Sequence, residues 1–467
     1  MQVPILNGIY TDNGPDIRTS YPVNLVPVPK KSGISNGFLR PGDGLVANGT
    51  GPGIDRGGIN WNGVCYRVMG TKLVTVASNG TVTTLGDVGG PTNQLVVFDY
   101  SFDRLAIASG GRLYYWNGAL TQVTDPDLGV VLDVVWVDGY FMTTDGTSLV
   151  VTELTDPTQV NPLKYGSSEV DPDPVVALLK LRNEVYALNR NTIEVFDNVG
   201  GDFFPFQRID GAQIQKGVIG THGCCVYLET VAFLGSGRNE QPGIYLGANA
   251  QAQKISTQEI DILLLNYTEV QLATVKLEAR NDKNHQHLYV HLPDRTVVYD
   301  AASSEALGEQ VWFTLTTSQV GFSQYRARNL VWAYDKWLVG DPQSSTIGYM
   351  VQDIGSHWGQ IVRWEFGTLI AYNEGNGAIF NELELVALTG RVALGVDPII
   401  STSYSVDGLA WSQDRPIRVG TTGSTKKRLA WFQQGHMLNW RIQRFRGDTQ
   451  AHLSFARLEA QIEALAY

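Results

Sequence analysis

Cysteine is scarce in this chain, which has three cysteines among its 467 residues: Cys65, Cys224 and Cys225. The number is odd and no C-x-x-C spacing occurs, so the sequence offers neither a disulfide framework nor a cysteine-based zinc site. Such cysteine usage is typical of proteins made in a reducing cytoplasm. We therefore expect neither disulfides nor structural zinc.

Long apolar runs and a basic leader are also missing. No run of 18 apolar residues occurs, and the N-terminus lacks a basic region followed by an apolar core. The sequence therefore predicts no membrane span and no export by a secretory signal.

Charged residues are few, at 17% of the chain against about a quarter in a typical soluble domain. Lys and Arg number 35 and Asp and Glu 46, which gives a formal net charge of −11. An acidic chain repels phosphate, which argues against wrapping DNA but suits a duct through which DNA must slide. A surface poor in charge favours assembly with other proteins.

Length and composition indicate a globular β protein. At roughly 150 residues per domain, the chain length suggests about two or three domains. Hydrophobic residues reach 43%, and the 50 Gly and 19 Pro together stay well below the level of disordered chains. Short alternating or apolar runs separated by Gly, Asn and Asp predict an all-β protein.

A two-strand unit recurs seven times from residue 57 onward. Each unit has an apolar strand, a tight polar turn and a second strand that begins with an aliphatic residue. These aliphatic anchors are Leu73, Leu113, Leu149, Ile193, Ile244, Val297 and Ile347. Their spacing, between 36 and 53 residues, suits a blade of four strands.

One such blade cannot bury both of its faces, whereas blades stacked around an axis cover each other and protect their edges. We therefore predict a β-propeller of six or seven blades over residues 55–353, with two tandem β-sandwiches as the alternative. Residues 1–54, rich in Pro and Gly, are predicted to form an extended N-terminal arm. Residues 354–467 are predicted to form a C-terminal β-sandwich platform domain.

One segment, residues 256–275, carries helical periodicity in place of strand alternation. It contains two possible capping boxes, Ser256 with Glu259 and Thr268 with Gln271. We expect a small helical insertion between two blades.

No group of residues predicts a catalytic or metal site. His285, His287 and His291 would project from one face of a strand, which is the best arrangement for a metal in the sequence. Because no cysteine completes the set, we interpret these histidines as the polar, solvent-facing side of a strand. His222 near Cys224 lacks a third group to orient a catalytic base. We therefore predict no enzyme activity, no metal and no cofactor.

The segment 415–446 departs from the acidic balance of the chain, because it contains no Asp or Glu. Its eight cations are Arg415, Arg418, Lys426, Lys427, Arg428, Arg441, Arg444 and Arg446. Trp431, Phe432, Trp440 and Phe445 lie between them. Arg and aromatic residues are enriched at protein interfaces and are also found at nucleic-acid surfaces. We predict a protein interface, with a solvated face and a DNA contact as alternatives.

Several motifs follow one another in an order that is similar to a known family. They are Y-P-V-N-L (21–25), Pro29-Lys30, G-F-L-R-P-G (37–42), N-T-I-E-V-F (191–196), Q-K-G-V-I-G-T (215–221), N-Y-T-E-V-Q-L-A-T (266–274) and H-L-P-D-R-T-V-V-Y-D-A-A-S-S (291–304). Together they resemble the tail accessory factor, or packaged-DNA stabilisation protein, of short-tailed bacteriophages (podoviruses). The resemblance is good over about residues 20–310 and loose in the C-terminal region.

The resemblance implies a structural virion protein of a short phage tail, assembled in the host cytoplasm. Copies of the chain would form a ring or nozzle, a hexamer by resemblance, below the portal and adaptor proteins. This tail hub would continue the DNA channel, retain packaged DNA without binding it specifically, and dock tail needle, spike or fibre proteins. The alternatives are a receptor- or glycan-binding tail module and a propeller-type polysaccharide-degrading enzyme.

Overall fold

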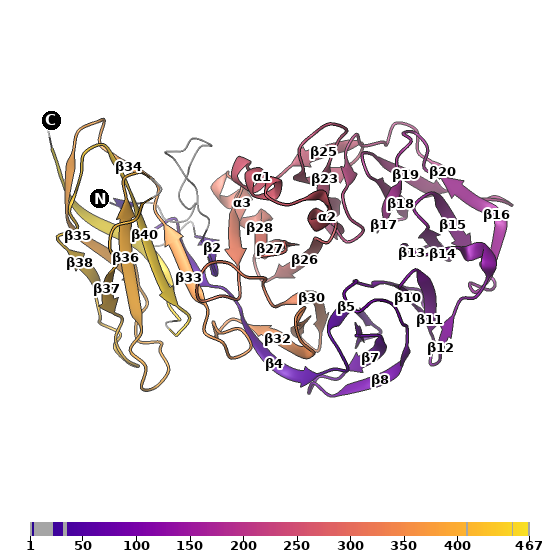
Figure 1. Ribbon diagram of the computed structural model, residues 1–467, viewed down its shortest axis with the longest axis horizontal. Coiled ribbons are helices and arrows are strands. Elements are labelled where there is room, and N and C mark those ends of the chain that lie inside the picture. The colour runs from indigo at the N-terminus through magenta and orange to yellow at the C-terminus, as the bar shows by residue number, and fades with distance from the viewer. Residues whose placement is uncertain (1, 4–21, 31–34, 408–409, 451, 466–467) are drawn as a thin grey trace.

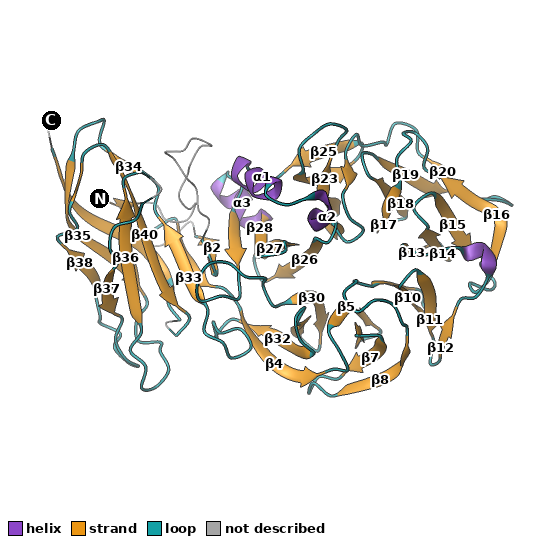
Figure 2. Cartoon of the chain, in the orientation of Figure 1, coloured by secondary structure: helices purple, strands orange, loops and turns teal. Residues whose placement is uncertain are grey.

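The computed structural model describes residues 2–3, 22–30, 35–407, 410–450 and 452–465. Figure 1 shows two β-rich bodies beside each other, a propeller and a sandwich of two sheets. Strands are the main regular structure of both bodies, and the few short helices lie on the propeller (Figure 2). The predicted all-β fold, a propeller followed by a sandwich, is confirmed.

Seven sheets form the propeller within the described residues. The first four blades are β5–β8 (Asp55–Trp61, Val64–Met69, Lys72–Val76, Val82–Asp87), β9–β12 (Val97–Tyr100, Leu105–Ser109, Arg112–Trp116, Leu120–Gln122), β13–β16 (Asp133–Val137, Tyr140–Thr144, Ser148–Thr152, Val160–Ser167) and β17–β20 (Val175–Leu181, Glu184–Asn189, Ile193–Asn198, Phe206–Arg208). The last three are β21–β25 (Gly217–Val218, Cys224–Tyr227, Thr230–Ser236, Gly243–Ala248, Gln251–Lys254), β26–β29 (Lys276–Asp282, His285–His291, Thr296–Asp300, Trp312–Leu315) and β30–β32 with β4 (Arg328–Ala333, Lys336–Gly340, Thr346–Val351, Gly44–Thr50).

The seven anchors occupy equivalent places in the seven blades. They lie in β7, β11, β15, β19, β24, β28 and β32, and each is at most 1% exposed. Strands β10 (L-A-I-A-S) and β14 (Y-F-M-T-T) are buried at every residue. A strand covered by neighbouring blades on both faces reads as a continuous apolar run, which is why the units stand out in the sequence.

The last blade is completed by a strand from the other end of the chain. β4 pairs antiparallel with β32, from Gly44 opposite Val351 to Thr50 opposite Thr346. β4 belongs to the segment that the sequence assigned to an extended arm. Residues 4–21 of the predicted arm lie outside the described residues, and the domain boundaries stay predictions.

Helices α1 (Gln258–Leu265) and α2 (Glu269–Leu272) lie between β25 and β26, inside the predicted insertion. Thr268 and Gln271 form the capping box of α2. The other possible box does not form, because α1 begins after Thr257 and the Ser256 hydroxyl donates to Asp261. Two short helices, η1 (Pro126–Leu128) and α3 (Ala301–Leu307), were not predicted, since so few residues show no helical period.

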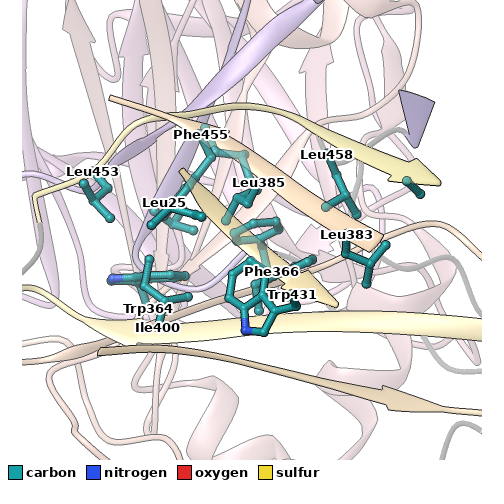
Figure 3. Packing of buried hydrophobic residues seen from close by; sticks show 14 of the residues in the cluster. Leu25, Trp364, Phe366, Leu383, Leu385, Ile400, Trp431, Leu453, Phe455 and Leu458 are labelled. Carbon is teal, nitrogen blue, oxygen red and sulfur yellow. The ribbon is translucent and has the colours of Figure 1, made fainter. Parts of the chain in front are cut away.

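The sandwich packs two sheets face to face. One sheet contains β1 (Gln2–Val3), β2 (Leu25–Pro29), β3 (Gly37–Pro41), β35 (Ala378–Ala387), β38 (Leu429–Phe432), β39 (His436–Met437) and β41 (Phe455–Ala464). The other contains β33 (Arg363–Gly367), β34 (Ala371–Tyr372), β36 (Ile399–Ser405), β37 (Arg415–Arg418) and β40 (Trp440–Asp448). Trp364, Phe366, Trp431 and Phe455 fill the space between the sheets (Figure 3), with the ring centroids of Trp364 and Phe455 4.8 Å apart.

The chain crosses between the two bodies twice. β2 and β3 belong to a sandwich sheet, whereas β4, which follows them directly, belongs to the propeller. The chain returns after β32 and enters the sandwich at β33. No helix among the described residues is long and apolar enough to cross a membrane.

Candidate assembly surface and buried polar clusters

The eight cations of the segment 415–446 lie on the sandwich but do not share one surface. Arg415, Arg418, Lys426, Lys427 and Arg428 are exposed, Arg444 and Arg446 are half-buried, and Arg441 is buried. The strands explain this division, because successive residues of β40 alternate between the sandwich core and its outer face.

Arg441 is a residue of the sandwich interior, with 1% of its surface exposed. Its guanidinium carbon lies 4.3 Å from the centroid of the Phe380 ring and 3.9 Å from that of Tyr404. It donates to the carbonyl of Gln434 at 2.7 Å and to Oε1 of Gln443 at 2.8 Å. Burial lowers the pKa of Arg441 to about 10. The prediction that Arg441 contacts a partner is wrong, because aromatic rings and amide oxygens enclose it.

Carboxylates from outside the segment pair with three of the other arginines. Arg428 contacts Glu384 at 2.8 Å and Glu382 at 3.0 Å. Arg418 lies 3.3 Å from Asp397, and Arg446 is paired with Asp414. Exposed pairs of this kind add little to stability but reduce the free positive charge of the surface.

Lys426 and Lys427 carry the unmatched charge of the segment. Their ammonium groups form no hydrogen bond or ion pair with any described residue. The two lysines lie in the loop between β37 and β38, and both are exposed. The remaining arginines bind locally: Arg415 donates to the carbonyl of Phe432 at 3.2 Å, and Arg444 stacks 3.9 Å from the centroid of Trp411. Contact of these seven cations with a partner stays a prediction.

The sandwich also exposes large apolar side chains. More than half of the surface is exposed for Tyr372, Leu388, Leu394, Val406, Phe432 and Leu438. Scattered apolar residues are ordinary on a protein surface, but apolar and aromatic side chains next to arginines are the composition of protein interfaces. The sequence pointed to Phe432 alone among these six, because loop residues have no period that reveals exposure.

The histidines of β27 are not solvent-facing, so that interpretation is wrong. His287 and His291 are buried, and the side chain of His285 is 11% exposed. His291 lies between Oγ1 of Thr296 and Oε2 of Glu278, each at 3.0 Å. Helix α3 and the neighbouring blade cover this face of the strand, which no local sequence pattern reveals.

Buried and half-buried carboxylates join the inner strands of adjacent blades. Asp99 of β9 accepts from the N–H of Trp136 at 2.6 Å, and Asp133 of β13 accepts from the N–H of Leu178 at 2.8 Å. Glu278 of β26 likewise accepts from the N–H of Asn329 at 3.0 Å. Burial raises the pKa of Asp133 to about 7. The sequence does not reveal these repeated contacts between blades, because single Asp and Glu residues in strands look like ordinary polar positions.

The cysteines are poor nucleophiles. Burial raises the pKa of both Cys224 and Cys225, so their thiols stay protonated at neutral pH. His222 beside them is kept neutral, since burial lowers its pKa to about 3. His222, Cys224 and Cys225 therefore have the properties of residues in the interior of a blade.

The architecture defines an all-β class of protein, in which a seven-bladed propeller is joined to a two-sheet sandwich that exposes several large apolar side chains. Residues 1–355 match the family model described as bacteriophage P22 Gp10, beta-propeller. Residues 363–463 match the model described as bacteriophage P22 Gp10, beta-sandwich. The chain therefore belongs to the phage P22 Gp10 family.

A curated relative agrees with this assignment. The tail hub protein gp10 of Salmonella phage P22 is 27% identical over 461 residues, which cover 93% of this chain and 94% of that protein. The resemblance seen in the sequence is confirmed. The chain is a structural protein of a short phage tail, with its place in the tail of the virion.

Two solved structures are less similar to this chain. The Neurospora crassa Pan2 WD40 domain is 10% identical, with a TM-score of 0.42 over 66% of this chain and 95% of that one. The designed Ika8 protein is 13% identical, with a TM-score of 0.39 over 66% of this chain and all of that one. The family assignment rests on the sequence matches alone.

Proposed function

We propose that copies of this chain form a ring or nozzle, the tail hub, below the portal and adaptor proteins of the tail. The ring continues the DNA channel, retains packaged DNA and docks needle, spike or fibre proteins. The observation that carries this proposal is the match of both bodies, in chain order and over nearly the whole length, to the family of a tail hub protein.

The sandwich is the docking platform in this proposal. Its exposed apolar side chains supply area for a protein interface, and the Lys426–Lys427 loop supplies unmatched positive charge. A partner that presents carboxylates to this loop would gain an attraction that salt screens, whereas apolar contacts are less sensitive to salt. Docking should therefore weaken, without being lost, as the salt concentration rises.

A comparison of two charge-reversal variants tests whether the Lys426–Lys427 loop of the sandwich contributes to docking. The double variant Lys426→Glu/Lys427→Glu reverses the charge of the loop and should weaken binding to the adaptor and portal proteins, most strongly at low salt. As a control, Arg182→Glu/Lys283→Glu makes the same change of formal charge at exposed positions of the propeller, where Arg182 lies 3.9 Å from Glu229 and Lys283 donates to Gln352, and it should bind as the wild type does. Co-sedimentation with assembled portal and adaptor measures both.

Equal binding of the two double variants would contradict the role of the loop. Binding of the isolated wild-type protein to host glycans, with no binding to portal or adaptor, would favour the receptor-binding alternative. Release of reducing ends from host polysaccharide would favour the enzymatic one.

A further inference from the structure

His287 is a buried polar residue without a hydrogen-bond partner. The residue is 2% exposed, and neither Nδ1 nor Nε2 forms a hydrogen bond with any described residue. Its ring packs edge-on against Phe313 at a centroid distance of 5.3 Å and against Tyr289 at 5.9 Å. Buried polar atoms nearly always have partners, so an unpaired imidazole requires an explanation such as an ion.

The nitrogens of His287 face two further groups that bind metals. Its Nε2 lies 3.7 Å from Oδ2 of Asp300, and Nδ1 of His285 lies 2.7 Å from the same oxygen. One ligand atom from each of the three residues falls within 4.8 Å of the others. Zinc bonds of about 2.0–2.1 Å at tetrahedral angles place ligand atoms roughly 3.4 Å apart, so small side-chain shifts suffice to enclose an ion.

We propose that His285, His287 and Asp300 form a binding site for one Zn²⁺ ion. Two imidazoles and one carboxylate are a common donor set for zinc, and water can reach a fourth position beside the partly exposed His285. When His285 binds the ion through Nδ1, its neutral ring carries its single proton on Nε2, so the hydrogen bond between Nδ1 and Asp300 is given up. The ion thus replaces a hydrogen bond and provides a partner for His287.

The surroundings hold the ligands in place. Asp300 accepts from the N–H of Gln286 at 3.0 Å and from the hydroxyl of Ser303 at 2.5 Å, which fixes its carboxylate. The nearby cation Arg280 is matched by Asp43 and Asp282, each at 2.6 Å, so it does not leave a free positive charge against the ion.

The position of the site suggests a structural role for the ion. Asp300 ends β28 and begins α3, and α3 contacts β2, the strand that leads from the sandwich (Figure 1). The Ser303 hydroxyl lies 3.4 Å from the carbonyl of Pro27 in β2. An ion bound here would therefore stabilise the blade at its contact with the strand pair of the sandwich.

Metal binding to the full chain tests the proposal. Protein stripped with chelator and dialysed should take up one equivalent of Co²⁺, the spectroscopic substitute for Zn²⁺, with the visible absorption of a tetrahedral site, and Zn²⁺ should displace it. Added Zn²⁺ should also raise the thermal midpoint of unfolding. Absence of both signals at neutral pH would overturn the proposal.

Two variants assign the signal to these residues. His287→Phe keeps an aromatic ring between Tyr289 and Phe313 but removes both nitrogens, and His285→Gln changes a partly exposed position, so it tests the site even where His287→Phe fails to fold. Each should bind Co²⁺ at least about 100-fold more weakly. His436→Ala, an exposed histidine of the sandwich, is the control and should bind as the wild type does. Unchanged binding in His285→Gln would contradict the site.

Discussion

Arg441 is a buried cation whose charge lies against two aromatic rings and two amide oxygens. Replacement by glutamate would bury an unpaired negative charge in the same place. We expect Arg441→Glu to lower the free energy of unfolding by about 3 kcal/mol or more. Urea denaturation followed by tryptophan fluorescence measures this loss in the full chain.

The exposed lysines give the matched comparison. Lys426→Glu reverses a charge that has no partner among the described residues, so it should change the free energy of unfolding by at most about 0.5 kcal/mol. If Arg441→Glu were equally mild, the buried position of Arg441 would be wrong.

Asp133 makes stability depend on pH. Its pKa is about 7 in the folded protein because burial disfavours the charged carboxylate, against 3.8 for the ordinary group. The folded state therefore favours the protonated form of Asp133. This ionisation does not change the free energy of unfolding below pH 3.8, and it lowers that free energy progressively as the pH rises to about 7. The cost reaches at most about 4 kcal/mol.

The variant Asp133→Asn removes this titration. It loses one acceptor at every pH, which gives a constant offset, but it does not become charged as the pH rises. The free energy of unfolding of the wild type minus that of the variant should therefore fall between pH 4 and pH 7, which urea titrations at several pH values measure. A difference that stays constant across this range would contradict the raised pKa.

The pairing of β4 with β32 closes the propeller, and a glycine permits the close approach of the two strands. A Cβ atom at Gly348 would lie 1.9 Å from the carbonyl oxygen of Val46. We expect Gly348→Val to displace β4, to destabilise the propeller by about 2 kcal/mol or more and to open residues 44–50 to a non-specific protease.

Gly201→Ala is the control for this variant. A Cβ atom at Gly201 would meet only the carbonyl oxygen of Phe204, at 3.8 Å, which is ordinary contact. Its thermal midpoint and its protease resistance should match those of the wild type. Equal resistance of Gly348→Val would show that β4 is not needed for closure.

The sequence predicted those elements whose signals are local and repeated. Each blade has an aliphatic anchor, such as Leu73 or Ile347, at the same buried place, and the spacing of these anchors predicted the propeller. The closing strand β4 could not be predicted in this way, because its partner β32 lies about 300 residues away in the chain. The burial of Arg441 was missed for a similar reason, since Phe380 and Tyr404 come from other strands.

The net charge of the whole molecule affects its affinity for duplex DNA. A net charge of −11, with most arginines of the basic segment paired or buried, leaves few cations to release counterions from phosphates. The free protein should therefore bind duplex DNA more weakly than micromolar at physiological salt, as fluorescence anisotropy measures. Sub-micromolar affinity would place the basic segment on the wall of the proposed DNA channel.

Electron microscopy of the protein mixed with its portal and adaptor proteins shows whether copies of the chain assemble into a ring. The proposed function, with the sandwich as docking platform, predicts a ring of several copies attached below the adaptor, with its axis along the proposed channel. Images in which the protein stays as single particles, away from an intact portal and adaptor assembly, would contradict the proposed ring.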